Sequence, residues 1–320
     1  MIICVLSFPT RLAPVQVQFG VGHPFSSGIS SIDYSVISMK MMQSYRESTL
    51  WRKRDLFDYS EQHVLFDTPS YFIDDVTEMY GTYLISGNEI ECEFTNDLLK
   101  RVTIYPNVTA EGLGCVSKSG ILYPQHYHLY GCMQFAKKIH PRFDEVFKLI
   151  LNKDADAKFL LLDGARSLIP RFRNHLHSNS SEDIYRNFVF VPRSGHLDYL
   201  HLLSLHSVFL NMFPFGSGIT SSEALSLCVP VIVAVGLNSV LPLAMQQISM
   251  LGEDLEKHLF AYTVKSFASK SVDVAFGRTI PLTEMKTRIC ERKYRLFGKD
   301  VLKNTTWEWM NFLSQVSLVY

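Results

Sequence analysis

A glycine-rich turn followed by hydroxyl side chains separates two apolar runs in the stretch "FPFGSGITSSEAL". Gly216 and Gly218 let backbone N–H groups approach a ligand closely, because glycine has no side chain. Thr220 and Ser221 can cap the helix that follows or donate hydrogen bonds to a phosphate. Glu223 lies in the first turn of that helix, where a carboxylate is stabilised and can accept hydrogen bonds from two ribose hydroxyls. An ordinary strand–helix turn with a good cap is the alternative interpretation, and the turn alone does not decide between the two.

Side chains of the types that bind phosphate also occur at two other positions between an apolar run and a predicted helix. In "YGCMQFAKKIHPRFD", Gln134 and Lys138 fall between an apolar run and a helical pattern, where lysine can meet a phosphate as a point charge and glutamine can hydrogen-bond to it. In "VPRSGHLDYL", Arg193 and His196 follow an apolar run and open a helix, whose N-terminus attracts anions. The alternatives are a solvated loop with a surface lysine, and a helix capped by Ser194 with an exposed His196.

The residues between these segments predict the elements that would hold them at one edge. From residue 121 onward, apolar runs alternate with helical apolar spacing, as in "HPRFDEVFKLILN". This alternation predicts a parallel sheet with helices on both faces, and ligands of such sheets bind at the carboxyl ends of the strands. The predicted strands are "ILYPQHYHLYGCMQ", "KFLLLDG", "NFVFVPR", "SVFLNMF" and "VPVIVAV", and the end of the chain predicts two helices broken at Gly298.

The N-terminal part has a different pattern, with short apolar runs between turn residues and few convincing helices. "VQVQFGVGHPFSSG", "SIDYSVIS" and "YSEQHVLF" predict short strands, and "MIICVLSF" predicts a buried parallel strand. The stretch from Gly87 to Gly120 has no clear period, so we expect an irregular connection between two domains there.

Composition and charge narrow the class of protein. The chain has 320 residues, of which 47% are hydrophobic and 19% are charged, enough for two globular domains. Lysine plus arginine equals aspartate plus glutamate, 31 of each, so a nucleic-acid partner is not indicated. No stretch approaches the roughly 18 apolar residues of a membrane span, and the apolar start lacks the basic region and cleavage site of a signal peptide.

Two further patterns could imply a bound metal or cross-links. Asp154 to Asp156 form "DAD", which resembles a metal–nucleotide motif but links a helix to a strand away from the ligand-binding strand ends, so we predict a solvated turn and no metal. The six cysteines include no C-x-x-C pair and lie in or beside apolar runs. We therefore expect reduced thiols in a reducing compartment, with disulfide pairing left open.

Several motifs together resemble the catalytic region of the O-GlcNAc transferase family, glycosyltransferase family 41, which also includes the SPINDLY O-fucosyltransferases. The segment "RLAPVQVQFGVGHPFSSGISSIDYSV" resembles the Ala-Pro-x-Gln, Gly-His-Pro and Ile-Asp-Tyr run of that family. "YSEQHVLF", "YGCMQFAKKIHPRFD", "VPRSGHLDYL" and "FPFGSGITSSEAL" follow in the family's order and spacing, over about residues 11–235. Motifs in register over this length are more specific than any one of them alone.

The resemblance implies a GT-B-like α/β fold, in which two Rossmann-like domains face each other across a cleft, with the first domain incomplete in this chain. We divide the chain into an acceptor-side domain with its connection, residues 1–115, and a nucleotide-sugar-binding domain with terminal helices, residues 116–320. The implied reaction is an inverting, metal-independent transfer of a sugar, usually GlcNAc, from a UDP-sugar to serine or threonine of an acceptor protein or peptide. We expect no cofactor beyond this donor, and a cytoplasmic or nuclear protein.

The resemblance also implies roles for single residues. Lys138 and Gln134 would contact the diphosphate, and Glu223 the ribose. His23, in "GHP", would face the cleft from the first domain, with a structural histidine in a loop turn as the alternative. The implied donor-binding residues are Gln134, Lys138, Arg193, His196, Gly216, Gly218, Thr220, Ser221 and Glu223.

The chain departs from the family pattern at two places. It starts inside the family's N-terminal domain and shows no helical repeats, so we expect a truncated or diverged chain that binds nucleotide better than it transfers sugar. Pro242 stands near the position of a family arginine, which predicts weaker donor binding. The alternatives are a non-catalytic nucleotide-binding module, a relative that uses GDP-fucose or UDP-glucose, and a sugar-nucleotide epimerase. The sugar, the base and the acceptor residue (Ser/Thr or Asn) stay open.

Overall fold

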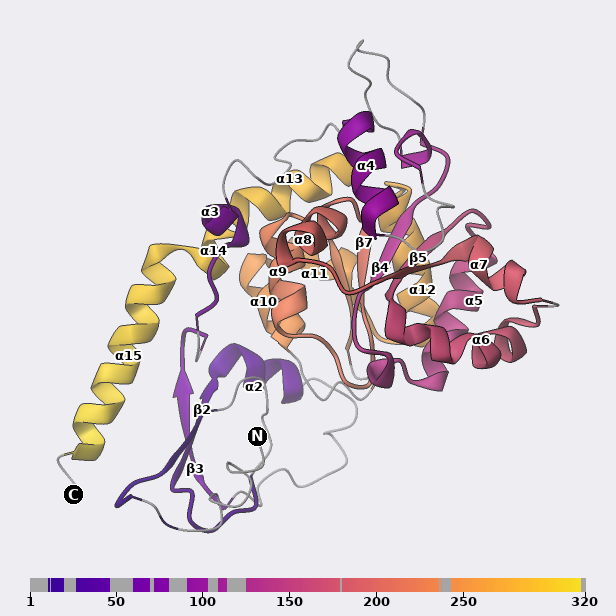
Figure 1. Cartoon of the computed structure of the whole chain (residues 1–320). Helices are drawn as coiled ribbons and strands as arrows, with labels where there is room; N and C mark the ends of the chain where they lie inside the picture. The colour runs from indigo at the N-terminus through magenta and orange to yellow at the C-terminus, as the bar shows by residue number, and fades with distance from the viewer. Residues whose placement is uncertain are drawn as a thin grey trace.

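The computed structural model describes most of the second half of the chain and shorter parts of the first. The described residues are 11, 13–19, 27–46, 60–69, 72–80, 91–102, 109–113, 125–178, 180–235, 237 and 243–317. Figure 1 shows two parallel sheets, the larger one inside a shell of helices and the smaller one beside the long C-terminal helix. Among the described residues, no helix is long and apolar enough to cross a membrane.

The larger sheet has six strands, all parallel, in the order β6-β5-β4-β7-β8-β9. The strands are β4 (Leu129–Cys132), β5 (Lys158–Leu162), β6 (Phe188–Val191), β7 (Val208–Asn211), β8 (Val231–Ala234) and β9 (Phe260–Ala261). The chain adds β5 and β6 on one side of β4, and then β7, β8 and β9 on the other. This doubly wound order confirms the predicted parallel sheet and makes the carboxyl ends of β4 and β7 the place where such sheets bind ligands.

Helices cover both faces of this sheet, because neighbouring residues of a strand point to opposite sides. Phe159 and Leu161 of β5 pack with α5, α6 and α12 in one hydrophobic core, whereas Leu160 packs with α4 and α8 in another. The helices of this part are α4 (Cys92–Val102), α5 (Asp144–Leu151), α6 (Ile169–Leu176), α7 (Ser181–Asn187), α8 (His196–Ser204), α9 (Ile219–Ser226), α10 (Leu243–Leu251), α11 (Glu253–Leu259), α12 (Val264–Ala275), α13 (Leu282–Arg292) and α14 (Tyr294–Phe297).

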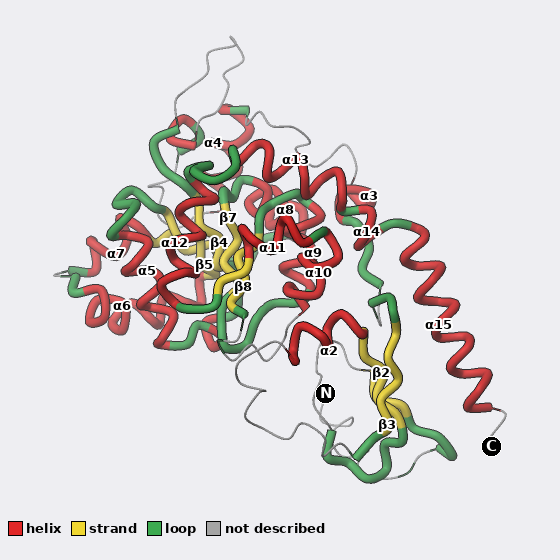
Figure 2. The backbone as a smooth tube through the Cα atoms, turned by 180° about the vertical axis from the view of Figure 1, so that it is seen from behind, coloured by secondary structure: helices red, strands yellow, loops and turns green. Residues whose placement is uncertain are grey.

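The smaller sheet is built from the predicted N-terminal strands and is completed by the end of the chain. Its parallel strands are β1 (Val17–Phe19), β2 (Tyr34–Ser38) and β3 (Gln62–Phe66), and α2 (Met39–Arg46) follows β2. The last helix, α15 (Lys299–Ser317), lies beside β2 and β3 (Figure 2), where Phe312 packs against Val36 and Phe66. The strand predicted at "MIICVLSF" lies outside the described residues.

Side-chain contacts connect the two sheets. Gln246 of α10 donates a hydrogen bond to Ser38 Oγ at the end of β2 (2.8 Å), and Met41 of α2 packs against Leu243. The short helix α3 (Val76–Tyr80), which follows the smaller sheet in sequence, packs against α9 of the larger domain.

Two expectations about the connections between elements need correction. The stretch from Gly87 to Gly120, predicted to be irregular, contains α4, whose Leu98 is fully buried against the larger sheet. The C-terminal helices do break at Gly298, but a further break at Lys293 separates α13 from α14. Both misses arise because the apolar faces of these helices are short and meet partners distant in sequence.

Two expectations about polar and sulfur-containing residues were also wrong. Asp154 is buried rather than solvated, and its carboxylate accepts a hydrogen bond from Tyr130 (2.9 Å). Cys228 and Cys290 form a disulfide, with their Cα atoms 5.1 Å apart, where reduced thiols were expected. The pair is separated by 62 residues, and only the docking of α13 beside the end of α9 brings the two together. The cysteines therefore no longer argue for a reducing compartment.

Candidate functional site

The carboxyl ends of β4 and β7 bring two of the predicted segments together. Lys138 ends a 3-10 turn, η4 (Ala136–Lys138), that follows β4, and its Nζ lies 4.5 Å from the ring centroid of Phe215. Phe215 directly precedes Gly216, whose φ of 79° is a left-handed conformation that glycine adopts without strain. The predicted convergence of Lys138 on the glycine turn is therefore present in the structure.

The helix after the glycine turn directs two of its hydroxyl groups inward. Ser221 is fully buried, and its hydroxyl donates to the carbonyl oxygen of Gly218 (2.7 Å), with the carbonyl oxygen of Ser217 3.1 Å away. The hydroxyl of Ser222 also donates to Gly218 (3.1 Å). The first N–H groups of a helix have no intrahelical acceptor and carry the positive end of the helix dipole. At this site, the backbone of α9 is thus better placed than these serine hydroxyls to bind a phosphate.

A buried carboxylate network lies beside the first turn of α9. Glu223 is 7% exposed and its Oε1 lies 2.8 Å from His196 Nε2. Tyr199, on the same helix as His196, also interacts with Glu223 and with Thr220. Burial raises the pKa of Glu223, and the hydrogen bond from His196 opposes this rise. On its other side, His196 Nδ1 lies 2.8 Å from the hydroxyl of Tyr80. The network offers hydrogen-bond donors and acceptors of the kinds that ribose hydroxyls need.

Among the described residues, the side-chain amide of Gln134 has no hydrogen-bond partner, and Lys138 lies against an aromatic ring. Gln134 is 4% exposed, and neither atom of its side-chain amide has a hydrogen-bond partner among the described residues. Buried amides are nearly always hydrogen-bonded, and leaving one unpaired costs about 1–3 kcal/mol. Burial lowers the pKa of Lys138, and the charge of Lys137 acts in the same direction. An anionic ligand at these strand ends would satisfy both side chains.

Solved structures share this architecture. A mutant of the O-GlcNAc transferase from Thermobaculum terrenum matches with a TM-score of 0.64 at 15% identity, over 97% of this chain and 50% of that one. A UDP-forming α,α-trehalose-phosphate synthase from Burkholderia vietnamiensis matches with a TM-score of 0.53 at 11% identity, over 95% of this chain and 67% of that one. The chain has a GT-B glycosyltransferase fold. No model of a protein family and no curated protein matches the sequence.

The GT-B fold does not by itself decide the reaction. The N-terminal domain of a trehalose-6-phosphate phosphatase from Candida albicans matches too, with a TM-score of 0.50 at 12% identity, over 90% of this chain and 59% of that one. The chain also spans only about half the length of the T. terrenum protein. The substrate must therefore be argued from the residues at the strand ends.

The structure places the predicted donor-binding side chains at three positions: beside the glycine turn, beside Glu223, and at the end of β6. Lys138 lies against the glycine turn, and His196 lies against Glu223. Arg193 is exposed at the end of β6, two strands away from β4. His23 and Pro242 lie outside the described residues.

Three aromatic residues of the site were missed from the sequence. Tyr199 is three residues after His196 and so shares its helix face, which is a signal that could have been used. Phe215 is the neighbour of Gly216, but nothing in its type predicts contact with a lysine. Tyr80 lies 116 residues before His196 and only the docking of α3 brings the two together.

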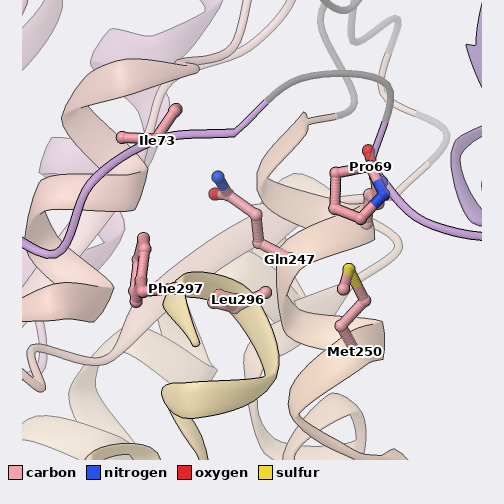
Figure 3. A pocket seen from close by; sticks show the side chains of 7 residues that line it. Pro69, Ile73, Gln247, Met250, Leu296 and Phe297 are labelled. Atoms are coloured by element: carbon pink, nitrogen blue, oxygen red, sulfur yellow. The ribbon is translucent and has the colours of Figure 1, made fainter. Parts of the chain in front are cut away.

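A small cavity lies between the two sheets, separate from these residues. Figure 3 shows it between the loop before α3 and helices α10 and α14, and its lining residues are Pro69, Ile73, Gln246, Gln247, Met250, Leu296 and Phe297. None of the predicted donor-binding residues lines it. The side-chain amide of Gln247 is hydrogen-bonded to Ser221 (3.2 Å) and Ser222, so it holds α10 against α9.

Proposed function

We propose that the chain is the nucleotide-sugar-binding part of a glycosyltransferase that takes a UDP-sugar, most simply UDP-GlcNAc, as its donor. The observation that carries this proposal is the position of Lys138 beside the glycine turn and the N-terminus of α9, at the strand ends of a GT-B fold. A lysine, a helix N-terminus and the unpaired amide of Gln134 fit a diphosphate. The buried carboxylate of Glu223 fits the hydroxyls of the ribose that is next to the diphosphate in such a donor.

Such a transfer needs no metal ion. As the bond between the sugar carbon and the diphosphate oxygen breaks, negative charge grows on the diphosphate. Lys138 and the N–H groups at the start of α9 would stabilise that charge in place of a divalent cation, since they are fixed before the reaction begins. We propose no further cofactor, because the donor supplies both the sugar and the leaving group.

We propose a serine or threonine of a protein or peptide as the acceptor, on the motifs shared with the O-GlcNAc transferase family. A small sugar phosphate is the second candidate, because the trehalose-phosphate synthase that matches 95% of this chain is a UDP-forming enzyme. The proposal retains the cytoplasm or the nucleus as the location. The disulfide of Cys228 with Cys290 counts against that location, since reducing compartments disfavour disulfides.

The diphosphate site is tested by calorimetry with UDP and uridine on Lys138→Ala. We expect UDP affinity to fall roughly 10–100-fold, because a charge-assisted contact contributes about 1.5–3 kcal/mol, and uridine affinity to stay unchanged. Glu223→Gln should instead weaken both ligands, because its partner is the ribose. Lys137→Ala is the matched control, since Lys137 is an exposed lysine on the same turn. Equal losses of UDP and uridine affinity on Lys138→Ala would contradict the assigned role.

Donor and acceptor are identified in two further steps. A thermal-unfolding panel with UDP, GDP, UDP-GlcNAc, UDP-glucose and GDP-fucose selects the donor, because a ligand at 100 times its dissociation constant adds about 2.7 kcal/mol of stability. The radiolabelled donor is then incubated with a peptide mixture and, separately, with sugar phosphates. Label on peptides supports protein glycosylation, label on sugar phosphates supports the second candidate, and binding without transfer would make the chain a non-catalytic nucleotide-binding module.

A further inference from the structure

Tyr80 approaches the nucleoside side of the site from outside the six-stranded domain. Its hydroxyl lies 2.8 Å from His196 Nδ1, and the two rings meet edge to face with centroids 5.6 Å apart. His196 Nε2 in turn lies 2.8 Å from Glu223 Oε1. The three side chains form one continuous chain of hydrogen bonds that ends on a buried carboxylate.

The direction of each bond follows from the chemistry of the groups. An ionised carboxylate only accepts hydrogen bonds, so the proton between His196 and Glu223 belongs to Nε2. In a neutral imidazole, Nδ1 then has no proton and must accept. The hydroxyl of Tyr80 is therefore the donor, and its bond selects the Nε2–H tautomer of His196.

Tyr80 is held in place by a firmly docked helix. Asp75, at the start of α3, is 7% exposed and pairs with Lys293 (2.8 Å). The backbone N–H of Val76 donates to Ser226 Oγ (3.0 Å), at the other end of α9 from the site. Val76 also packs against Leu200 of α8. These contacts fix α3 against both α8 and α9, the two helices that carry His196 and Glu223.

We propose that Tyr80 is a positioning residue for the nucleoside end of the donor, an inference that rests on the proposed function. By donating to His196 Nδ1, it holds the imidazole with Nε2–H directed at Glu223. The carboxylate has about four acceptor positions. Among the described residues, His196 donates to one of them and Tyr199 interacts with the same carboxylate, so acceptor positions remain for the hydroxyls of a ribose.

The arrangement also explains how a buried carboxylate can serve as an acceptor. Burial raises the pKa of Glu223, which favours the protonated form, and a protonated carboxyl loses acceptor capacity. The hydrogen bond from His196 acts against this shift. If the imidazole turned or changed tautomer, its bond to Glu223 would be lost and the carboxylate would be a poorer partner for ribose. The diphosphate contacts of Lys138 would not change.

The test is Tyr80→Phe, which keeps the ring and removes only the hydroxyl. We expect ¹⁵N NMR of the ligand-free protein at pH 8 to show His196 as the Nε2–H tautomer in the wild type and as a mixture in the variant. By calorimetry, we expect uridine and UDP affinity to fall by the same factor, about 3–10-fold, since one neutral hydrogen bond is lost. Tyr294→Phe is the matched control, because Tyr294 is an exposed tyrosine on α14, away from the site.

Each result decides a separate point. An unchanged His196 spectrum in Tyr80→Phe overturns the proposal, and so does a changed tautomer with unchanged uridine affinity. A loss confined to UDP would assign Tyr80 to the diphosphate and also overturn it. If wild-type protein binds no nucleotide or nucleoside, the proposed function and the ribose role fail together, and the NMR comparison alone decides whether Tyr80 sets the His196 tautomer.

Discussion

The two edges of the six-stranded sheet differ in how particular buried polar side chains are paired. At the amino edge, His206 bonds to the carbonyl oxygen of Leu203 through Nδ1 and has no partner for Nε2 among the described residues, whereas Asp154 and Lys158 are paired. Asp154, before β5, bonds to Tyr130 (2.9 Å) and His128 (3.2 Å), and the Nζ of Lys158 donates to the carbonyl oxygen of Arg186 (2.8 Å). These groups are satisfied within the fold, so their role is structural.

At the carboxyl edge, the buried Gln134 and the partly buried Lys138 differ from Asp154 and Lys158. The amide of Gln134 has no hydrogen bond within the described part of the chain, and Lys138 lies against an aromatic ring rather than a carboxylate. A fold that can pair Lys158 and Asp154 at one edge can also pair polar groups at the other. The unpaired amide of Gln134 and the position of Lys138 support the proposed diphosphate site, because both lie at the edge where doubly wound sheets bind ligands.

The largest expected effect is on stability at the amino edge. Asp154→Ala removes the acceptor of Tyr130, whose hydroxyl would be left unpaired in the core. We expect the free energy of unfolding to fall by about 3 kcal/mol, as for the loss of a buried charged hydrogen-bond partner. Urea titration followed by fluorescence measures this change, and UDP affinity of the folded variant should equal that of the wild type.

Asp156, two residues after Asp154, provides the control. Asp156 has an exposed side chain that lies 3.9 Å from the equally exposed Arg186, so Asp156→Ala should change stability by no more than about 0.5 kcal/mol. Similar losses for the two aspartates would mean that burial does not distinguish them. A UDP affinity that fell with Asp154→Ala would mean that the amino edge also takes part in binding.

A second prediction concerns the loss of stability at low pH caused by a buried histidine at the amino edge. His206, just before β7, is fully buried, and burial lowers its pKa to about 4. The unfolded chain takes up a proton near the ordinary imidazole pKa of about 6.5, so stability falls as the pH drops from about 6.5 toward 4. Between pH 7 and pH 5 we expect a loss of about 2 kcal/mol from this residue.

The slope of stability against pH identifies this contribution. His206→Asn changes the absolute stability, but it cannot titrate, so its curve between pH 7 and pH 5 should be flatter than that of the wild type by about 2 kcal/mol. Parallel curves would show that His206 does not govern the acid response. Other histidines titrate in both proteins and cancel in the comparison.

Much of the larger sheet could be predicted from the sequence because its signals are local. Alternating strands and helices imply a parallel sheet, and glycines such as Gly216 mark the turn after a strand. The missed features depend on contacts between distant segments. α4 was missed because its apolar face packs against strands that come later in the chain. The Cys228–Cys290 disulfide depends on how α13 docks, which no local pattern records.

The candidate site divides in the same way. The positions of Lys138 and Glu223 near the carboxyl ends of the strands could be predicted from residue type and from their place after a strand. The orientation of side chains could not be: Ser221 directs its hydroxyl inward, although its type suggested a phosphate contact. Tyr80 gave no signal, because an aromatic residue in a connection is usually a packing residue.

The smallest expected effect, and the most direct test of the carboxyl edge, is Gln134→Met. Methionine has a similar length and volume but no amide, so the variant removes a buried polar group that has no partner. We expect the free energy of unfolding to stay the same or to rise by about 1 kcal/mol. UDP affinity should fall about tenfold, close to 1.4 kcal/mol, because one hydrogen bond to the diphosphate is lost.

Gln246→Met is the matched control, because Gln246 is a glutamine of similar burial whose amide is bonded to Ser38 Oγ (2.8 Å). Here the substitution leaves a buried hydroxyl without its partner, so stability should fall by about 1–2 kcal/mol while UDP affinity stays the same. Chemical denaturation and calorimetry on both variants therefore give opposite patterns if Gln134 is held open for a ligand. A loss of stability in Gln134→Met equal to that in Gln246→Met would mean that Gln134 is an ordinary satisfied core residue, and the contrast between the two edges would not hold.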